Sequence, residues 1–143
     1  MPSIEERFSA ALHNTARTWR QALDRRLKYL GVGQASWMAI ASIAKAGKPL
    51  SQTELANLLA VEDPTMVAMI DRLVKAGLVN RVPSQTDRRV KQVVLTDAGN
   101  EIYLKVKTEA DAFRAEFLSK IDQEKLIAAT ELLEALQAAA ELA

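Results

Sequence analysis

The sequence predicts a mainly α-helical domain with one small β-hairpin. Apolar residues recur every three or four positions over most of the chain, which is the spacing of amphipathic helices. One stretch of β-branched residues interrupts that spacing in the second half. With 143 residues, 49% of them hydrophobic, the chain can bury one core, so residues 1–143 are expected to form a single domain.

The N-terminal stretch is predicted to form a long helix over about residues 4–30. Gly31 and Gly33 are expected to end it, because glycine accepts the left-handed backbone that follows a helix. A second helix is predicted from about Gln34 to Ala46, with Gly47 as its stop. The apolar positions that define these two helices are Ile4, Phe8, Leu12, Trp19, Leu23, Leu27, Leu30, Trp37, Ile40, Ile43 and Ala44.

A short third helix is predicted to begin at Ser51. Ser51 and Glu54 have the capping-box spacing, in which the serine hydroxyl and the glutamate carboxylate accept two otherwise unpaired backbone amides. That spacing on its own indicates no more than a helix start. The residues expected to face the core are Leu55, Leu58 and Leu59.

A fourth helix is predicted to follow at once and to run to Gly77. Asp63 is a favourable N-cap residue, and Pro64 suits the first helical position. The predicted buried face comprises Met66 or Val67, Ile70, Leu73 and Val74, and the predicted outer face comprises Thr65, Ala68 and Arg72.

From Leu78 the pattern changes to two β-branched runs on either side of the polar segment 83–89. This pattern predicts a β-hairpin with a long basic tip. Two further helices are expected after it, the first capped at Thr96 and the second at Asp122. Their apolar positions are Ile102, Val106, Ala110, Phe113, Phe117, Ile121, Leu126, Leu133, Leu136 and Ala140.

Two short helices followed by a basic hairpin have the order of a winged helix-turn-helix, a DNA-binding arrangement. A major groove about 12 Å wide admits one helix, so the helix after Pro64 can present side chains to base edges. Arg88 and Arg89 lie at the hairpin tip, and arginines on a protruding loop suit the narrow minor groove. An Asp-Arg-Arg turn alone is usually a solvated loop, so the prediction depends on the combination.

Charge distribution agrees with this interpretation, although the net charge is only +1. Residues 1–61 carry eight Lys or Arg against four Asp or Glu, and residues 62–96 carry six against four. Residues 97–143 carry five against ten. A surface that binds nucleic acid is therefore expected in the first two-thirds of the chain, away from the acidic C-terminal part.

Several classes of protein are excluded or disfavoured by composition. The absence of cysteine excludes disulfides and thiol chemistry, and one histidine leaves no histidine pair for a metal. No catalytic set, phosphate-binding loop or cofactor motif can be assembled, so we expect neither an enzyme nor a cofactor. No apolar run is long enough to span a membrane and no signal peptide is evident, so a cytoplasmic location is expected.

The chain resembles the MarR family of bacterial regulators, in particular its SlyA-like branch. Residues 34–37, 52–56, 64–65, 70–73 and 77–79 carry part of the resemblance, and the most specific part is Asp87-Arg88-Arg89 followed by Leu95-Thr96 and Gly99. The resemblance implies one domain with a DNA-binding lobe over about residues 34–96. It implies dimerisation helices over about residues 4–30 and 97–141.

By this resemblance the protein is a homodimeric transcriptional regulator, expected to be a repressor of a palindromic operator. Arg89 would enter the minor groove while Asp87 holds an arginine of the hairpin, and Arg72 would lie near the DNA backbone. Ala68 departs from SlyA-like proteins, which can carry an arginine there. The candidate DNA-binding residues are Ser51, Thr53, Pro64, Thr65, Ala68, Arg72, Asp87, Arg88, Arg89 and Lys91.

The resemblance also implies a small phenolic or aromatic carboxylate effector that releases DNA. The matching positions are Arg17, Arg20 and Trp37, since a guanidinium can pair with a carboxylate while a ring stacks on the indole. A core tryptophan beside solvated arginines is the other interpretation of these residues. For the whole chain, the alternative function is a winged-helix module that binds an acidic protein without sequence-specific DNA binding.

Overall fold

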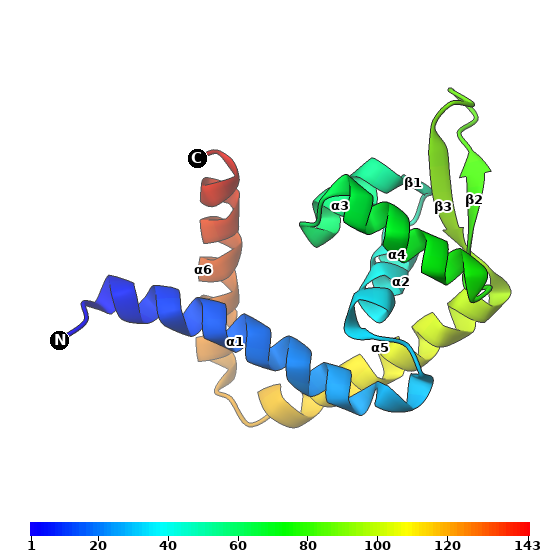
Figure 1. Ribbon diagram of the computed structural model, residues 1–143. Helices are drawn as coiled ribbons and strands as arrows, with labels where there is room; N and C mark the ends of the chain where they lie inside the picture. Colours follow the sequence, from blue (N-terminus) through cyan, green and yellow to red (C-terminus); the bar gives the residue numbers. More distant parts are fainter. The chain divides into compact units, whose positions relative to one another are not determined.

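The computed structural model describes residues 1–143 and confirms a mainly helical fold with a small antiparallel sheet (Figure 1). The chain divides into two compact units, residues 1–109 and 110–143, and helix α5 runs from the first into the second. The elements in order are α1 (Ile4–Arg26), the 3-10 helix η1 (Lys28–Leu30), α2 (Gln34–Lys45), β1 (Leu50–Ser51), α3 (Gln52–Leu59), α4 (Asp63–Lys75), β2 (Val79–Pro83), β3 (Lys91–Leu95), α5 (Asp97–Leu118) and α6 (Gln123–Glu141).

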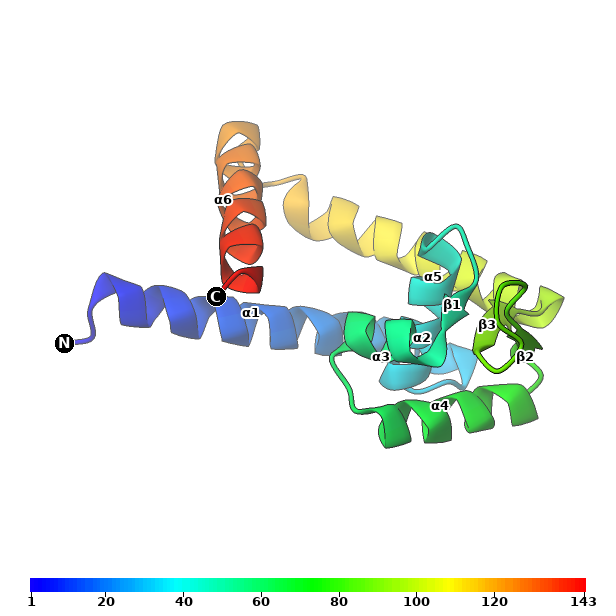
Figure 2. The ribbon, with the colours of Figure 1, turned by 90° about the horizontal axis from the view of Figure 1, so that it is seen from above.

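Helices α2, α3 and α4 and the sheet enclose the core of the first unit. The two views place α4 along the front of this lobe, with α2 behind it (Figures 1 and 2). Burial of these apolar side chains is the main term that favours the folded lobe. The largest fully buried side chains of this core are Ile40, Leu55, Met66, Ile70, Val79 and Val93.

The sheet has three strands in the order β1-β3-β2, of which only the hairpin β2–β3 was predicted. In the hairpin, Val79 pairs with Leu95 and Pro83 with Lys91. Strand β1 has two residues, too few for an alternating pattern to be visible in the sequence, and its Leu50 pairs with Val93. Strand β3 is thereby paired on both sides, while β2 lies at the edge of the sheet.

The turns between helices follow the predictions in part. Gly31 has φ 73° and ends η1, as expected, but the prediction for Gly33 was wrong. Gly33 has extended backbone and is the N-cap residue of α2. Between α3 and α4 the left-handed residue is Ala60, with φ 54°, where the side chain makes this conformation costlier than for glycine.

Helix α3 turns a different face to the core than predicted. Leu55 and Ala56 are buried and Leu59 is partly buried, whereas Leu58 is 62% exposed. Positions 55, 56 and 59 share one face of a helix, and Leu58 lies outside it. The prediction that Leu58 faces the core was therefore wrong.

Helix α4 begins one residue earlier than predicted. Glu62 is the N-cap residue, and Asp63 is already helical, so the prediction of an Asp63 cap was wrong. The Glu62 carbonyl accepts the amide of Met66 at 3.0 Å. Pro64 remains in the first turn, where its missing N–H needs no partner.

The junction between α4 and α5 is built around two backbone carbonyls. The Thr96 hydroxyl donates to the Gly77 carbonyl at 2.7 Å, and the Thr96 amide donates to the Leu78 carbonyl at 3.1 Å. The same hydroxyl accepts the amide of Gly99 at 3.1 Å, which confirms that Thr96 caps α5. This junction fixes the start of α5 against the base of the hairpin.

The second unit, residues 110–143, contains the end of α5 and helix α6. The rings of Phe113 and Phe117 lie 4.7 Å apart between centroids, one helical turn from each other. Asp122 caps α6 by accepting the Lys125 amide, as predicted. None of the helices in the chain is both long enough and apolar enough to cross a membrane.

Candidate nucleic-acid interface

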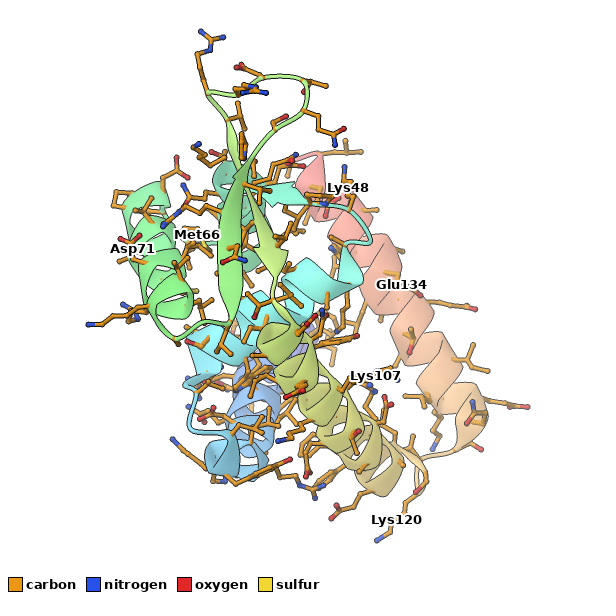
Figure 3. All side chains as sticks on the ribbon, turned by 90° about the vertical axis from the view of Figure 1, so that its right-hand side faces the viewer. Lys48, Met66, Asp71, Lys107, Lys120 and Glu134 are labelled. Carbon is orange, nitrogen blue, oxygen red and sulfur yellow. The ribbon has the colours of Figure 1, made fainter.

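Helix α4 presents the predicted outer face to solvent. Thr65, Ala68 and Arg72 are exposed, as is Pro64 in the first turn. Figure 3 shows Met66 on the inner side of α4 and Asp71 further out. The side chains buried beneath the helix are Met66, Met69, Ile70 and Leu73.

Of the predicted alternatives Met66 and Val67, Met66 is the buried residue, whereas the prediction that Val74 is buried was wrong. Val67 is 40% exposed and Val74 is 37% exposed, while Met69 takes the place expected for one of them in the core. Met66, Met69, Ile70 and Leu73 recur at intervals of three and four, and this stripe leaves the valines on its flank.

The start of α3 adds Ser51 and Thr53 near the hairpin, because β1 pairs with β3. The capping box is confirmed: the Ser51 hydroxyl accepts the Glu54 amide at 3.0 Å, and the Glu54 carboxylate accepts the Ser51 amide at 3.0 Å. The hydrogen bond from the Ser51 amide holds the pKa of Glu54 below its ordinary value. Thr53, in the first turn of α3, is exposed.

The sequence analysis missed Arg81, which joins three elements. From β2 its Nε donates to the Gln52 side-chain oxygen at 2.8 Å, and its terminal nitrogen donates to Asp71 at 2.6 Å. The same nitrogen lies 3.4 Å from the Val67 carbonyl. Arg81 therefore ties the hairpin to the first turn of α3 and to the middle of α4.

Asp71 is an acidic side chain on an otherwise uncharged or basic outer stripe of α4. It is 60% exposed, whereas the side chain of Arg81 is only 27% exposed. The ion pair offsets a negative charge that would otherwise repel an approaching phosphate. Nothing local in the sequence marks this pair, since the two residues are separated by the turn from α4 into β2.

The tip of the hairpin is held by an aspartate, as predicted. Asp87 accepts from Nε and from a terminal nitrogen of Arg89, both at 3.1 Å, and from the Arg89 amide at 3.1 Å. The side-chain hydrogen bond from Arg89 holds the pKa of Asp87 below its ordinary value. Arg89 is nonetheless 91% exposed, so its remaining N–H groups stay accessible.

A buried serine organises the rest of the tip. The Ser84 hydroxyl lies 3.0 Å from the Thr86 hydroxyl, 3.3 Å from the Thr86 amide and 3.4 Å from the Asp87 amide. The Ser84 amide donates to the Val90 carbonyl at 2.9 Å. The tip, which stands clear of the helices in Figure 1, is thus internally bonded. In the sequence, Ser84 directly after Pro83 is consistent with an ordered turn. Because this pair is common in turns of all kinds, it does not identify the hydrogen bonds of Ser84.

All ten candidate DNA-binding residues lie in the first unit, on β1, α3, α4 or the hairpin. Arg88, Arg89 and Lys91 on the hairpin are exposed, as is Arg72 on α4. A helix with an open outer face, joined through Arg81 to a basic hairpin, defines the winged helix-turn-helix class of DNA-binding proteins.

The three candidate effector residues occupy different environments. Arg17 and Arg20 are exposed on α1, and Arg17 donates to the Asn14 side chain at 3.1 Å. Trp37 is only 6% exposed, and its indole nitrogen donates to Asp24 of α1 at 2.9 Å. The tryptophan is thus a core residue that links α1 to α2, while both arginines face solvent.

Comparison with known proteins gives the family. Residues 34–91 match the MarR family. A solved structure of the transcriptional regulator PA3341 is 34% identical, with a TM-score of 0.89, over 95% of this chain and 99% of that one. The chain belongs to the MarR family, whose members are transcriptional regulators.

Two more distant structures share the fold. A mutant of MarR from E. coli, in complex with operator DNA, is 23% identical with a TM-score of 0.78, over 90% of this chain and 91% of that one. CouR from Rhodococcus jostii RHA1, bound to p-coumaroyl-CoA, is 18% identical with a TM-score of 0.81, over 95% of each chain.

Proposed function

We propose that this protein binds double-stranded DNA sequence-specifically, with α4 in the major groove and the hairpin tip in the minor groove. The observation that carries the proposal is the Arg81 junction, which holds α4 and the basic hairpin as one surface. Operator DNA is bound by the MarR mutant with the same fold. The proposed contacts are the ten candidate residues named from the sequence, from Ser51 to Lys91.

Replacing Arg89 by alanine is expected to weaken operator binding by about 1 to 3 kcal/mol. The guanidinium is 91% exposed and is oriented by Asp87, so it is available to a minor groove without first being ordered. The measurement is a fluorescence-anisotropy titration, at fixed salt, with a duplex selected from genomic fragments.

The matched control is Lys120→Ala, a surface cation that lies outside the proposed interface. Its affinity for the duplex should equal that of the parent protein. Equal affinity for the Arg89 variant as well would contradict the minor-groove assignment. Binding that does not weaken as salt rises would favour the alternative, a protein-interaction module, because phosphate contacts impose a steep salt dependence.

The proposed assembly is a homodimer on a palindromic operator. Apolar side chains that recur on one face of α1 are exposed in the single chain, namely Ile4, Phe8 and Leu12. Helix α6 leaves Ile127, Leu132, Leu133 and Leu136 exposed. A two-fold axis would repeat α4 at about one DNA turn, roughly 34 Å.

We expect the protein to sediment as a dimer, and Phe8→Asp combined with Leu133→Asp to produce monomers. The free energy needed to bury a carboxylate in either apolar face would exceed the free energy gained from the apolar contact between subunits. Analytical ultracentrifugation over a range of concentrations provides the measurement. A monomeric parent protein would contradict the assembly.

The proposed mode of action is repression in the cytoplasm, relieved by a small phenolic or aromatic carboxylate near Arg17, Arg20 and Trp37. The hydrogen bond from Trp37 to Asp24 joins α1 to the lobe that carries α4, so an acid held by the two arginines of α1 would act on α4 through this link. Within the family, the proposed placement is the SlyA-like branch, by the overall resemblance described in the sequence analysis.

Salicylate is expected to change the emission of Trp37 saturably and to release the duplex over the same concentration range. The Trp19→Phe variant isolates the signal of Trp37, since the chain has two tryptophans. Arg17→Ala with Arg20→Ala should abolish both responses. A fluorescence change without release, or no response in either assay for a panel of such acids, would contradict the effector site.

A further inference from the structure

The exposed face of the first two turns of α4 carries methyl groups and few polar ones. Its exposed residues are Asp63, Pro64, Thr65, Val67 and Ala68. None of them has the amide or guanidinium that reads a purine edge with two hydrogen bonds. The first long cation of the helix, Arg72, comes about two turns after the start.

Val67 is the unusual member of this face. It is 40% exposed, although β-branched apolar residues are favoured in cores and disfavoured in helices. Its backbone carbonyl accepts a hydrogen bond from the Arg81 side chain, which holds this turn of the helix beside the hairpin. The side chain lies on the flank of the buried stripe, next to Ala68, and is accessible there.

The rest of the outer face has a different chemistry. Arg72 and Lys75 are exposed cations in the last turns of α4, and Asp71 beside Arg72 is paired with Arg81. The family resemblance places Arg72 near the DNA backbone, where a cation positions a helix without carrying sequence information. With these cations on phosphates, the first two turns are the part of α4 that is left to contact base edges.

In the major groove, thymine is distinguished by its 5-methyl group, which makes apolar contact with alanine or with the methyl of threonine. We propose that Thr65, Val67 and Ala68 recognise the 5-methyl groups of thymines in each operator half-site. This inference rests on the proposed function, in which α4 enters the major groove. The inference adds that the feature recognised in the groove is the thymine 5-methyl group.

The test compares thymine with deoxyuridine, which lacks only the methyl group and pairs identically. A tight duplex is first selected from a random library, and each thymine of one half-site is then replaced singly. At one or more positions the affinity should fall about fourfold, the value expected for one buried methyl-sized group. Equal affinity for every substituted duplex would overturn the proposal.

Two conservative variants assign the effect to α4. Thr65→Ser removes a methyl and keeps the hydroxyl, and Val67→Thr exchanges a methyl for a hydroxyl. Each should reduce the thymine-to-uracil ratio toward one at its own position and leave the ratio unchanged elsewhere. The control is Thr108→Ser on α5, whose hydroxyl is bonded to the Leu104 carbonyl.

The outcomes separate this inference from the proposed function. Selection of no duplex at all would overturn both. Tight, salt-dependent binding with no preference for thymine over uracil would overturn the methyl readout and leave sequence-specific binding standing. A preference that survives in both α4 variants would also overturn it as stated, because Thr65 and Val67 would then contribute nothing to the readout.

Discussion

Replacing Gly99 by alanine is expected to lower the free energy of unfolding by about 3 kcal/mol. A Cβ added there would lie 2.1 Å from the Leu78 carbonyl oxygen and 3.2 Å from a methyl of Leu95. The Leu78 carbonyl cannot move aside freely, since it already accepts the Thr96 amide. Urea unfolding of the full chain, followed by circular dichroism, measures the change.

The control for this substitution is Gly33→Ala. No heavy atom lies within 4 Å of the Cβ built at Gly33, and its φ of −76° suits any residue. Because alanine is a poorer N-cap residue than glycine, we expect a loss of about 1 kcal/mol or less there. Comparable stability of the Gly99 and Gly33 variants would show that the junction between α4 and α5 tolerates a side chain.

Replacing Arg81 by methionine is expected to weaken operator binding roughly a hundredfold, or by about 3 kcal/mol. Methionine retains bulk but loses the hydrogen bonds to Gln52 and Asp71, and it leaves the Asp71 carboxylate unpaired on the proposed DNA-facing helix. Anisotropy titration at fixed salt gives the affinity, and a thermal melt reports whether the lobe remains folded.

Two further variants separate positioning from simple loss of stability. Asp71→Asn in the Arg81→Met background should recover part of the affinity, because the unpaired negative charge is gone. Arg114→Met breaks another arginine–aspartate pair, with Asp111 on α5, and should leave binding unchanged. An Arg81 variant that binds within about twofold of the parent would contradict a role of this junction in DNA binding.

The features that sequence reasoning predicted correctly are encoded by neighbours in the chain. The capping box at Ser51, the cap at Asp122 and the stop at Gly47 each depend on residues within one helical turn. The pairing of Asp87 with an arginine at the tip was likewise accessible, because the partner is two residues away. These signals act before any tertiary contact forms.

The features that were missed depend on which elements meet. Leucine is a residue type typical of cores, and only the packing of α3 against its neighbours shows that Leu58 points outward. Arg81 meets Gln52 across 29 positions of sequence, and β1 exists only because β3 is beside it. Periodicity defines the faces of an element but not the residue that each face will contact.

The three-stranded order has a consequence for how the hairpin can bend. Val93 of β3 is paired with Leu50 of β1 on one side and with Arg81 of β2 on the other. The middle of β3 is therefore restrained by backbone pairing on both edges. The tip between Pro83 and Lys91 has no strand pairing. Hydrogen bonds to the Ser84 hydroxyl hold the tip together as one rigid loop. In the proposed complex, adjustment to minor grooves of different width would therefore occur at Pro83 and Lys91, while α4 keeps its orientation.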